Sequence, residues 1–240
     1  MQRFARSILQ LGAPLAVLAF WGGMAAAAHT YPTGYDWRYQ TISVLTYPDH
    51  DPRGYFWAWM GLELCGLAGI AWSSELIDRF KAVIGTPHFA GLQMMRVGFL
   101  SMCCAVLPDR LLPLPKGHEL LAIVAFVGIS AGVAQQIFMV IANSGAAARR
   151  GAMARFWATA CASVPLLPLL LAALTQAYLG LARPSLPWVS PAWRSLGIPI
   201  YLSFGVWEWV SCAVFSGCFL VLWHRCAALA STVDARAAPR

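Results

Sequence analysis

The sequence predicts an all-α integral membrane protein, a bundle of six transmembrane helices with both termini in the cytoplasm. Of its 240 residues, 59% are hydrophobic and only 11% are charged, whereas soluble domains carry about 25% charged residues. The mean hydropathy is +0.62. Apolar segments of membrane-spanning length use up nearly the whole chain and leave no room for a second folded unit. We therefore expect residues 1–240 to form a single transmembrane domain.

The first two predicted spans carry signals at their ends and on their packing faces. The apolar run from Ile8 to Ala28 follows basic residues and ends in small ones, as a cleaved signal peptide would. It is longer than the usual signal core of about 7–15 residues, so we expect a retained helix. In the second span Gly61, Cys65 and Gly69 place small residues four apart, and this spacing lets a neighbouring helix approach closely.

The four later spans are separated by connections that contain prolines or basic residues. The fourth contains Gly128 and Gly132, a GxxxG pair that predicts close helix contact. Pro165 and Pro168 predict a kink in the fifth span, either as a simple packing bend or as a functional opening of the helix. The six predicted spans are residues 8–28, 54–73, 88–107, 119–142, 156–180 and 198–223.

Lysine and arginine set the predicted orientation. Placing both termini in the cytoplasm leaves more basic residues inside than outside, as the positive-inside rule requires. The net charge of +7 then reflects topology and attraction to anionic lipids, and it gives no reason to invoke nucleic acid. No cysteine falls in a predicted outer loop, so we expect no disulfide framework. The inner basic residues are Arg3, Arg6, Arg79, Lys81, Arg149, Arg150, Arg155, Arg225, Arg236 and Arg240, and the outer ones are Arg38, Arg53, Arg110, Lys116, Arg183 and Arg194.

Three ionisable side chains, Glu63, Arg96 and Glu208, lie deep in three separate predicted spans. A charge at membrane depth is costly unless it is paired or hydrated, so such residues mark candidate functional sites. At a rise of 1.5 Å per residue, each lies about 12–15 Å from the end of its span, near the midplane. We expect Arg96 to neutralise one glutamate and leave the other protonated. The alternatives are a buried ion pair that only fixes helix register, and unrelated solvated positions.

Polar and aromatic side chains near these charges would complete a ligand cavity. Glutamines on the third and fourth spans extend the polar network, and tryptophans lie close to both glutamates along their helices. An interfacial aromatic belt or ordinary core packing explains the tryptophans equally well. The predicted cavity residues are Asp36, Trp59, Gln93, Gln136, Trp207 and Trp209, with Gln135 as the alternative to Gln136.

Acidic and imidazole side chains gather in the first two predicted outer loops. At the mouth of a bundle such groups can ligate a divalent metal or share acid and base roles. Their spacing matches no metal signature, and helix capping or a turn at Asp-His-Asp-Pro explains the first loop as well. The metal candidates are His50, Asp49, Asp51 and His118, and the catalytic candidates are Glu63, Glu208, Arg96, His118 and Asp109.

A tyrosine and an aspartate precede an Ile-Ser-x-Leu segment, a glycine-rich span follows, and a Pro-Asp turn leads to a histidine that opens the fourth span. This pattern resembles a family of bacterial six-span membrane proteins of unknown function, the domain-of-unknown-function family 998, which is distantly DRAM-like. The resemblance covers roughly residues 1–130 and implies a fold in the bacterial inner membrane without implying a chemistry. The family has an acidic residue after the Ile-Ser pair, where this chain has Val44. The matching residues are Tyr35, Asp36, Ile42, Ser43, Leu45, Pro108, Asp109 and His118.

Three functions remain open. The sequence contains no P-loop, dinucleotide fingerprint, HExxH, paired CxxC or G-x-S-x-G motif, so it assigns no cofactor. The first function is an outward-opening amphipathic cavity that binds or modifies a lipid or hydrophobic small molecule, with acid–base chemistry if it is an enzyme. The second is an accessory or assembly subunit that docks on other membrane subunits. The third is a proton-coupled carrier of a small solute.

Overall fold

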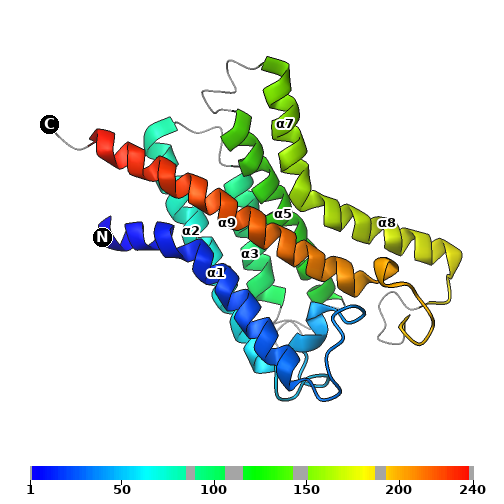
Figure 1. The fold of residues 1–240 in the computed structure, drawn as a ribbon. Coiled ribbons are helices and arrows are strands. Elements are labelled where there is room, and N and C mark those ends of the chain that lie inside the picture. The colour runs from blue at the N-terminus through cyan, green and yellow to red at the C-terminus, as the bar shows by residue number, and fades with distance from the viewer. Residues whose placement is uncertain (1, 85–89, 106–115, 143–150, 187–192, 238–240) are drawn as a thin grey trace.

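The described residues of the computed structural model are all-helical (Figure 1). The structure describes residues 2–84, 90–105, 116–142, 151–186 and 193–237. Three short 3-10 helices connect or extend the longer elements: η1 (Ile42–Thr46), η3 (Val164–Leu166) and η5 (Ile200–Leu202). The α-helices are α1 (Gln2–Thr30), α2 (Tyr55–Ile84), α3 (Ala90–Ala105), α5 (Gly117–Ala142), α7 (Gly151–Ser163), α8 (Leu167–Ala182) and α9 (Phe204–Ala237).

Among the described residues, four helical segments are long and apolar enough to cross a membrane. They are Ser7–Thr30, Gly117–Ile141, the α7–α8 segment Gly151–Ala182, and Phe204–Cys226. This finding confirms the coarser part of the prediction, an all-helical architecture with segments long and apolar enough to cross a membrane. The second and third predicted spans also form helices, α2 and α3, although neither is among these four.

The sixth predicted span begins later than the sequence suggested. Residues 198–203 contain an extended start and the short helix η5, and α9 starts only at Phe204. Pro199 accounts for this because its extended backbone, with φ −60° and ψ 145°, precedes η5. Glu208 therefore lies about 6 Å inside the first residue of α9. Glu208 is therefore closer to the start of its helix than the sequence predicted.

Glycines bring two pairs of helices into close contact. A Cβ atom added at Gly23 of α1 would lie 2.7 Å from the Cα atom of Gly61 in α2. A Cβ added at Gly128 of α5 would lie 3.0 Å from the Cα of Gly98 in α3. Both distances are shorter than ordinary carbon contacts, so only glycine fits there. These contacts confirm the predicted packing roles of Gly61 and of the Gly128–Gly132 pair.

Helix α9 runs across the bundle between α1 and α8 (Figure 1). Two indole N–H groups of this interface donate hydrogen bonds: Trp21 of α1 to Ser216 at 3.1 Å, and Trp223 of α9 to the Leu9 carbonyl at 2.8 Å. Each N–H thus has an acceptor in an apolar surrounding, where an unpaired one would be costly. Helix α1 is an integral part of the core.

The predicted kink in the fifth span is confirmed. Helix α7 ends at Ser163, η3 contains Pro165, and α8 begins at Leu167 with Pro168 at its start. Because proline lacks an N–H group, the α-helical hydrogen-bond ladder cannot run through this segment. The chain turns sharply there, so that α7 lies along α5 and α8 continues along α9 (Figure 1).

The first predicted outer loop folds back onto the bundle. Within it, η1 buries Ile42 and Leu45 against the main core, and Leu45 is 0% exposed. The Tyr35 hydroxyl lies 3.0 Å from the carbonyl oxygens of Gln40 and Thr41 and accepts a 2.9 Å hydrogen bond from the Trp209 indole. Burial raises the pKa of Tyr35 above its usual range. The loop is therefore a structured part of the domain.

Candidate functional site

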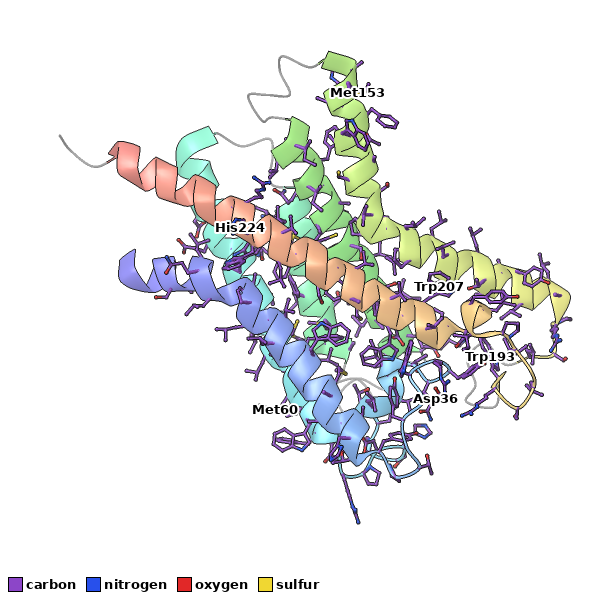
Figure 2. All side chains as sticks on the ribbon, in the orientation of Figure 1. Asp36, Met60, Met153, Trp193, Trp207 and His224 are labelled. Carbon is purple, nitrogen blue, oxygen red and sulfur yellow. The ribbon has the colours of Figure 1, made fainter. Side chains whose placement is uncertain are left out.

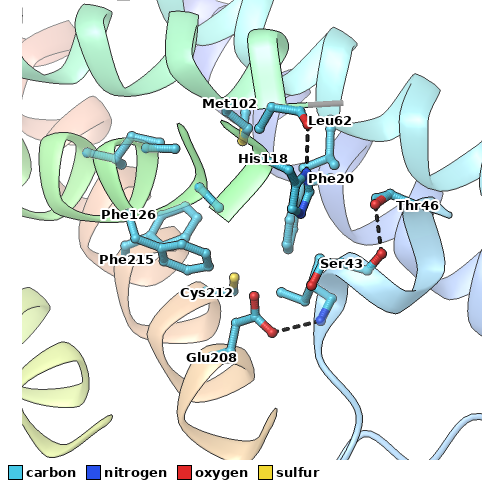
Figure 3. A pocket seen from close by; sticks show the side chains of 15 residues that line it. Phe20, Ser43, Thr46, Leu62, Met102, His118, Phe126, Glu208, Cys212 and Phe215 are labelled. Atoms are coloured by element: carbon cyan, nitrogen blue, oxygen red, sulfur yellow. Dashed lines mark hydrogen bonds between the residues drawn. The ribbon is translucent and has the colours of Figure 1, made fainter. Parts of the chain in front are cut away.

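A cavity lies where η1 meets α1, α2, α3, α5 and α9 (Figure 3). The volume of the cavity is about 60 Å³, which is enough for several water molecules or a small chemical group. Its walls are mostly aliphatic and aromatic, and a few polar side chains interrupt them. The lining residues are Phe20, Ile42, Ser43, Thr46, Leu62, Met102, Ala105, His118, Ala122, Ala125, Phe126, Ile129, Glu208, Cys212 and Phe215.

Glu208 is the acidic group of the cavity. Its side chain is 9% exposed and comes from the second turn of α9. One carboxylate oxygen accepts the Ile42 backbone N–H at 2.7 Å. The other oxygen points into the space between Phe215 and Ser43 (Figure 3). The hydrogen bond joins α9 to the start of η1, because the first N–H groups of a helix have no partner within that helix.

His118 is the imidazole of the cavity, in the first turn of α5. Its Nδ1 lies 2.7 Å from the carbonyl oxygen of Ala105, the last residue of α3. A carbonyl only accepts hydrogen bonds, so Nδ1 carries the proton and Nε2 of the neutral ring keeps its lone pair. Nε2 is buried and has no hydrogen-bond partner. The Tyr47 ring packs on the imidazole, with ring centroids 5.2 Å apart.

Two hydroxyl groups of the cavity already take part in hydrogen bonds. The Thr46 hydroxyl donates to the Ser43 carbonyl at 2.7 Å, and the Ser43 hydroxyl lies 3.0 Å from that of Thr41. Cys212 lies one turn after Glu208 on α9 and contributes a free thiol, which is only a weak hydrogen-bonding group. The second oxygen of Glu208 and Nε2 of His118 are strong acceptors for which the described residues show no hydrogen-bond donor. Both can accept a hydrogen bond, and together they can accept and return a proton.

The predicted cluster of Glu63, Arg96 and Glu208 does not form. Among the described residues, no ion pair joins Arg96 to either glutamate, and its guanidinium instead donates to Gln93 at 3.2 Å. Only Glu208 lines the cavity. Glu63 is half-buried, and its backbone oxygen lies 4.0 Å from the Cys103 sulfur.

The pairing of α2 with α3 explains why Glu63 and Arg96 are separated. Gly69 of α2 faces Phe99 of α3, with a Cβ built there only 2.6 Å from the ring, and Gly66 faces Cys103. This antiparallel register places Glu63 of α2 level with the end of α3. Arg96 lies about nine residues before that end, so the two side chains are separated by about 13 Å along the helix axes. Counting depth from predicted span ends could not reveal this offset, because register depends on side chains of both helices.

The other predicted cavity residues lie elsewhere, and none of them lines this cavity. Trp209 packs in the core against Trp21 at 5.7 Å, Trp207 donates to the Tyr201 carbonyl at 2.7 Å, and Trp59 packs near Phe56. Core packing, one of the two alternatives to cavity lining, thus accounts for Trp209.

Gln136 and Asp36 hold elements together. Gln136 is buried on α5 beside Gly91 of α3. Asp36 pairs with Arg38 at 2.7 Å and with Arg194 at 3.3 Å, and the hydrogen bonds and charge of Arg38 lower the pKa of Asp36. The Arg194 contact joins the first loop to the segment before α9, at the end of the molecule where Trp193 and Trp207 also lie (Figure 2). Asp109 falls outside the described residues.

The predicted metal candidates do not converge. Within the described part of the chain, no three histidine, cysteine, aspartate or glutamate side chains are arranged to hold a metal ion. Asp49 and His50 are exposed, whereas Asp51 is 0% exposed. Asp51 accepts the Gly54 N–H at 2.9 Å, across the turn at residues 52–54 that leads into α2. The structure therefore supports the alternative of a turn at Asp-His-Asp-Pro for Asp51.

The sequence did not predict that η1 and the start of α5 together form one wall of the cavity. Ile42, Ser43 and Thr46 were placed in an outer loop, yet they line the cavity with His118. The available signal was the apolar Ile-Ser-Val-Leu run inside an otherwise polar loop, because such a run must find a core to bury.

The fold and this cavity define a class: an all-helical protein with helices long and apolar enough to cross a membrane, and with a small, mostly apolar cavity lined by one buried carboxylate and one imidazole. No protein-family profile, curated protein or solved structure matches the chain. The likeness to the six-span bacterial family therefore stays a prediction from the residues.

Proposed function

We propose that the cavity binds the polar end of a lipid or another hydrophobic small molecule. Ligand sites are typically concave and mostly apolar, with a few polar groups that fix orientation. One observation carries the proposal. Glu208 and His118 each have one polar atom without a hydrogen-bond partner in the described residues, and both line a cavity whose other walls are largely phenylalanine and aliphatic side chains.

We also propose a cellular location and a membrane topology for the protein. The protein would cross the bacterial inner membrane six times, with α2 and α3 spanning beside the four clearest helices and both termini in the cytoplasm. The cavity would then lie toward the outer face, since η1 lies within the first predicted outer loop and the start of α5 follows the second. An apolar chain would extend from the cavity toward the lipid.

An acid–base role, if turnover follows binding, would fall to two residues. The Nε2 lone pair of His118 is available to accept a proton from the ligand, and Glu208 is the acidic group of the same cavity. Glu63 and Arg96 would take no part because neither lines the cavity.

Photolabelling tests binding directly. The probe is an analogue of dodecanol with a diazirine in its chain, added to the protein in phosphatidylcholine nanodiscs, and the labelled peptides are mapped by mass spectrometry. The cavity is blocked by Ala122→Trp on α5, and the matched control is Val127→Trp, which places the same ring on the 50% exposed face of that helix.

We expect labelling of cavity peptides in the wild type and in Val127→Trp, and its loss in Ala122→Trp. Equal labelling of all three proteins, or labelling confined to outward-facing side chains, would overturn the proposal.

A further inference from the structure

We propose that the ligand carries a protonated primary amine, which pairs with Glu208 and donates a hydrogen bond to His118. This inference rests on the proposed function and names the chemical class of the ligand. Three features of the cavity point to it: the hydrogen-bond roles of its free polar atoms, its uncompensated acid and its aromatic walls.

The first feature is that both free polar atoms can accept hydrogen bonds. Nε2 of His118 holds a lone pair because Nδ1 donates to the Ala105 carbonyl. The second oxygen of Glu208 is an acceptor whenever the group is ionised, since the Ile42 N–H occupies only the first. One polar group that carries at least two hydrogen atoms can satisfy both atoms. A primary ammonium brings three.

The second feature is the charge of the cavity. No lysine or arginine is among the residues that line it, and Glu208 forms no ion pair within the described part of the chain. Buried carboxylates are normally paired, because an isolated charge in a medium of low dielectric constant is costly. A cationic ligand supplies the missing partner, whereas an anionic headgroup would add a second negative charge beside Glu208.

The third feature is the presence of three phenylalanine side chains in the walls of the cavity. Phe20, Phe126 and Phe215 all line the cavity, and the centroids of Phe20 and Phe215 are 6.3 Å apart. The faces of aromatic rings attract cations, and cages of such rings bind ammonium groups. Three rings and one carboxylate are the elements of an ammonium site, and the apolar walls suit the alkyl chain of the same molecule (Figure 3).

These features also separate close chemical relatives. A quaternary ammonium satisfies the charge and the rings but has no N–H for His118. An alcohol satisfies His118 but brings no charge to Glu208. Phospholipid headgroups and fatty acids carry anionic oxygens, for which no cationic side chain is among the lining residues. We therefore expect a long-chain primary amine without a phosphate group.

Competition against the photoreactive dodecanol provides the test. Dodecylamine, dodecyltrimethylammonium, dodecanol and dodecanoate are titrated at neutral pH, and labelling that persists in Ala122→Trp is subtracted as membrane background. We expect dodecylamine to compete at a concentration at least about tenfold below that of any other compound, a difference of about 1.4 kcal/mol. Equal competition by the amine and the alcohol would refute this inference.

Two variants test the residues. Glu208→Gln keeps an oxygen for the Ile42 N–H and removes the charge, so the preference for amine over alcohol should fall to less than about threefold. Phe126→Leu, at a half-buried position, should weaken amine binding by about two- to fivefold more than it weakens alcohol binding. An amine preference that survives in both variants would overturn the assignment.

The two proposals fail in different ways. If dodecanol labels the cavity and Ala122→Trp blocks it, but amines show no advantage, the cavity binds hydrophobic molecules and only the amine assignment is wrong. If Ala122→Trp changes no labelling, both proposals are wrong.

Discussion

Adjacent glycines on α1 provide a strict test of the packing between α1 and α2. A Cβ atom at Gly23 would lie 2.5 Å from the Trp57 carbonyl oxygen and 2.7 Å from the Gly61 Cα. A Cβ atom at Gly22 would meet nothing within 4 Å. The substitutions Gly23→Ala and Gly22→Ala add the same methyl group to the same helix, one residue apart, so their difference isolates the contact.

The expected cost follows from the distances. Ordinary contacts begin near 3.4 Å, so Gly23→Ala forces the two helices apart by about 0.7–0.9 Å at this point. A gap of that size removes a quarter to a half of each contact of about 0.1–0.2 kcal/mol, and over roughly fifty atom pairs the loss is about 1–5 kcal/mol, with about 3 kcal/mol at the middle of both ranges. This loss is offset in part because alanine is about 1 kcal/mol more favourable than glycine within a helix. Gly23→Ala should therefore destabilise the fold by about 1–3 kcal/mol, and Gly22→Ala should stabilise it by up to about 1 kcal/mol.

Free cysteines make the assay simple. Cys65, Cys212 and Cys226 are buried and unpaired, whereas Cys161 is exposed. A thiol-reactive dye therefore labels the exposed cysteine at once and the buried cysteines only as the helix bundle unfolds. Melting curves of the purified variants in detergent should place the Gly23→Ala midpoint below that of the wild type and the Gly22→Ala midpoint at or above it. Coincident curves for the two variants would refute the inferred close contact between the helices.

Two further predictions concern carboxyl groups of the first loop and are followed by tryptophan fluorescence. Asp51→Ala removes the bond to the Gly54 N–H and should cost about 0.5–2 kcal/mol, whereas Asp51→Asn keeps an acceptor oxygen and should retain most of the stability. Burial raises the pKa of Asp51, so the wild type should gain stability as pH falls from neutral toward about 4, a gain absent from Asp51→Asn. Arg38 lowers the pKa of Asp36, so the ion pair stabilises the fold above about pH 4, and this stabilisation is lost as pH falls through the lowered pKa. Asp36→Asn should remove this loss of stability in acid, which we expect to be under about 1 kcal/mol because the pair is partly exposed. A loss of stability where a gain is expected, or a gain where a loss is expected, would contradict the environments assigned to Asp51 and Asp36.

Much of the helical framework was predictable because its signals are local. Apolar length located the helices, and Pro165 and Pro168 marked the break between α7 and α8. Gly128 and Gly132 marked a close helix contact, since small residues at this spacing fit few other arrangements. The start of α9 was missed because hydropathy alone does not register the extended backbone at Pro199.

The candidate site was only half visible in the sequence. Glu208 and His118 were singled out as unusual residues for their positions, and both line the cavity. The pairing of Glu208 with Arg96 was wrong because depth along a predicted span says nothing about helix register or about which face a side chain occupies. The actual partner of Glu208 is the backbone N–H of Ile42, a group that every residue except proline carries and that therefore leaves no mark in the sequence.

The sequence by itself determined that this chain is helical and apolar enough to enter a membrane, because those properties depend on composition and on the length of apolar runs. The tertiary structure alone decided which polar groups face one another. Folding η1 back onto the bundle brings the Ile42 N–H to Glu208 and gathers Ser43, Thr46 and His118 around one space. That arrangement depends on helix register and loop path, and these are set by contacts between residues far apart in the chain.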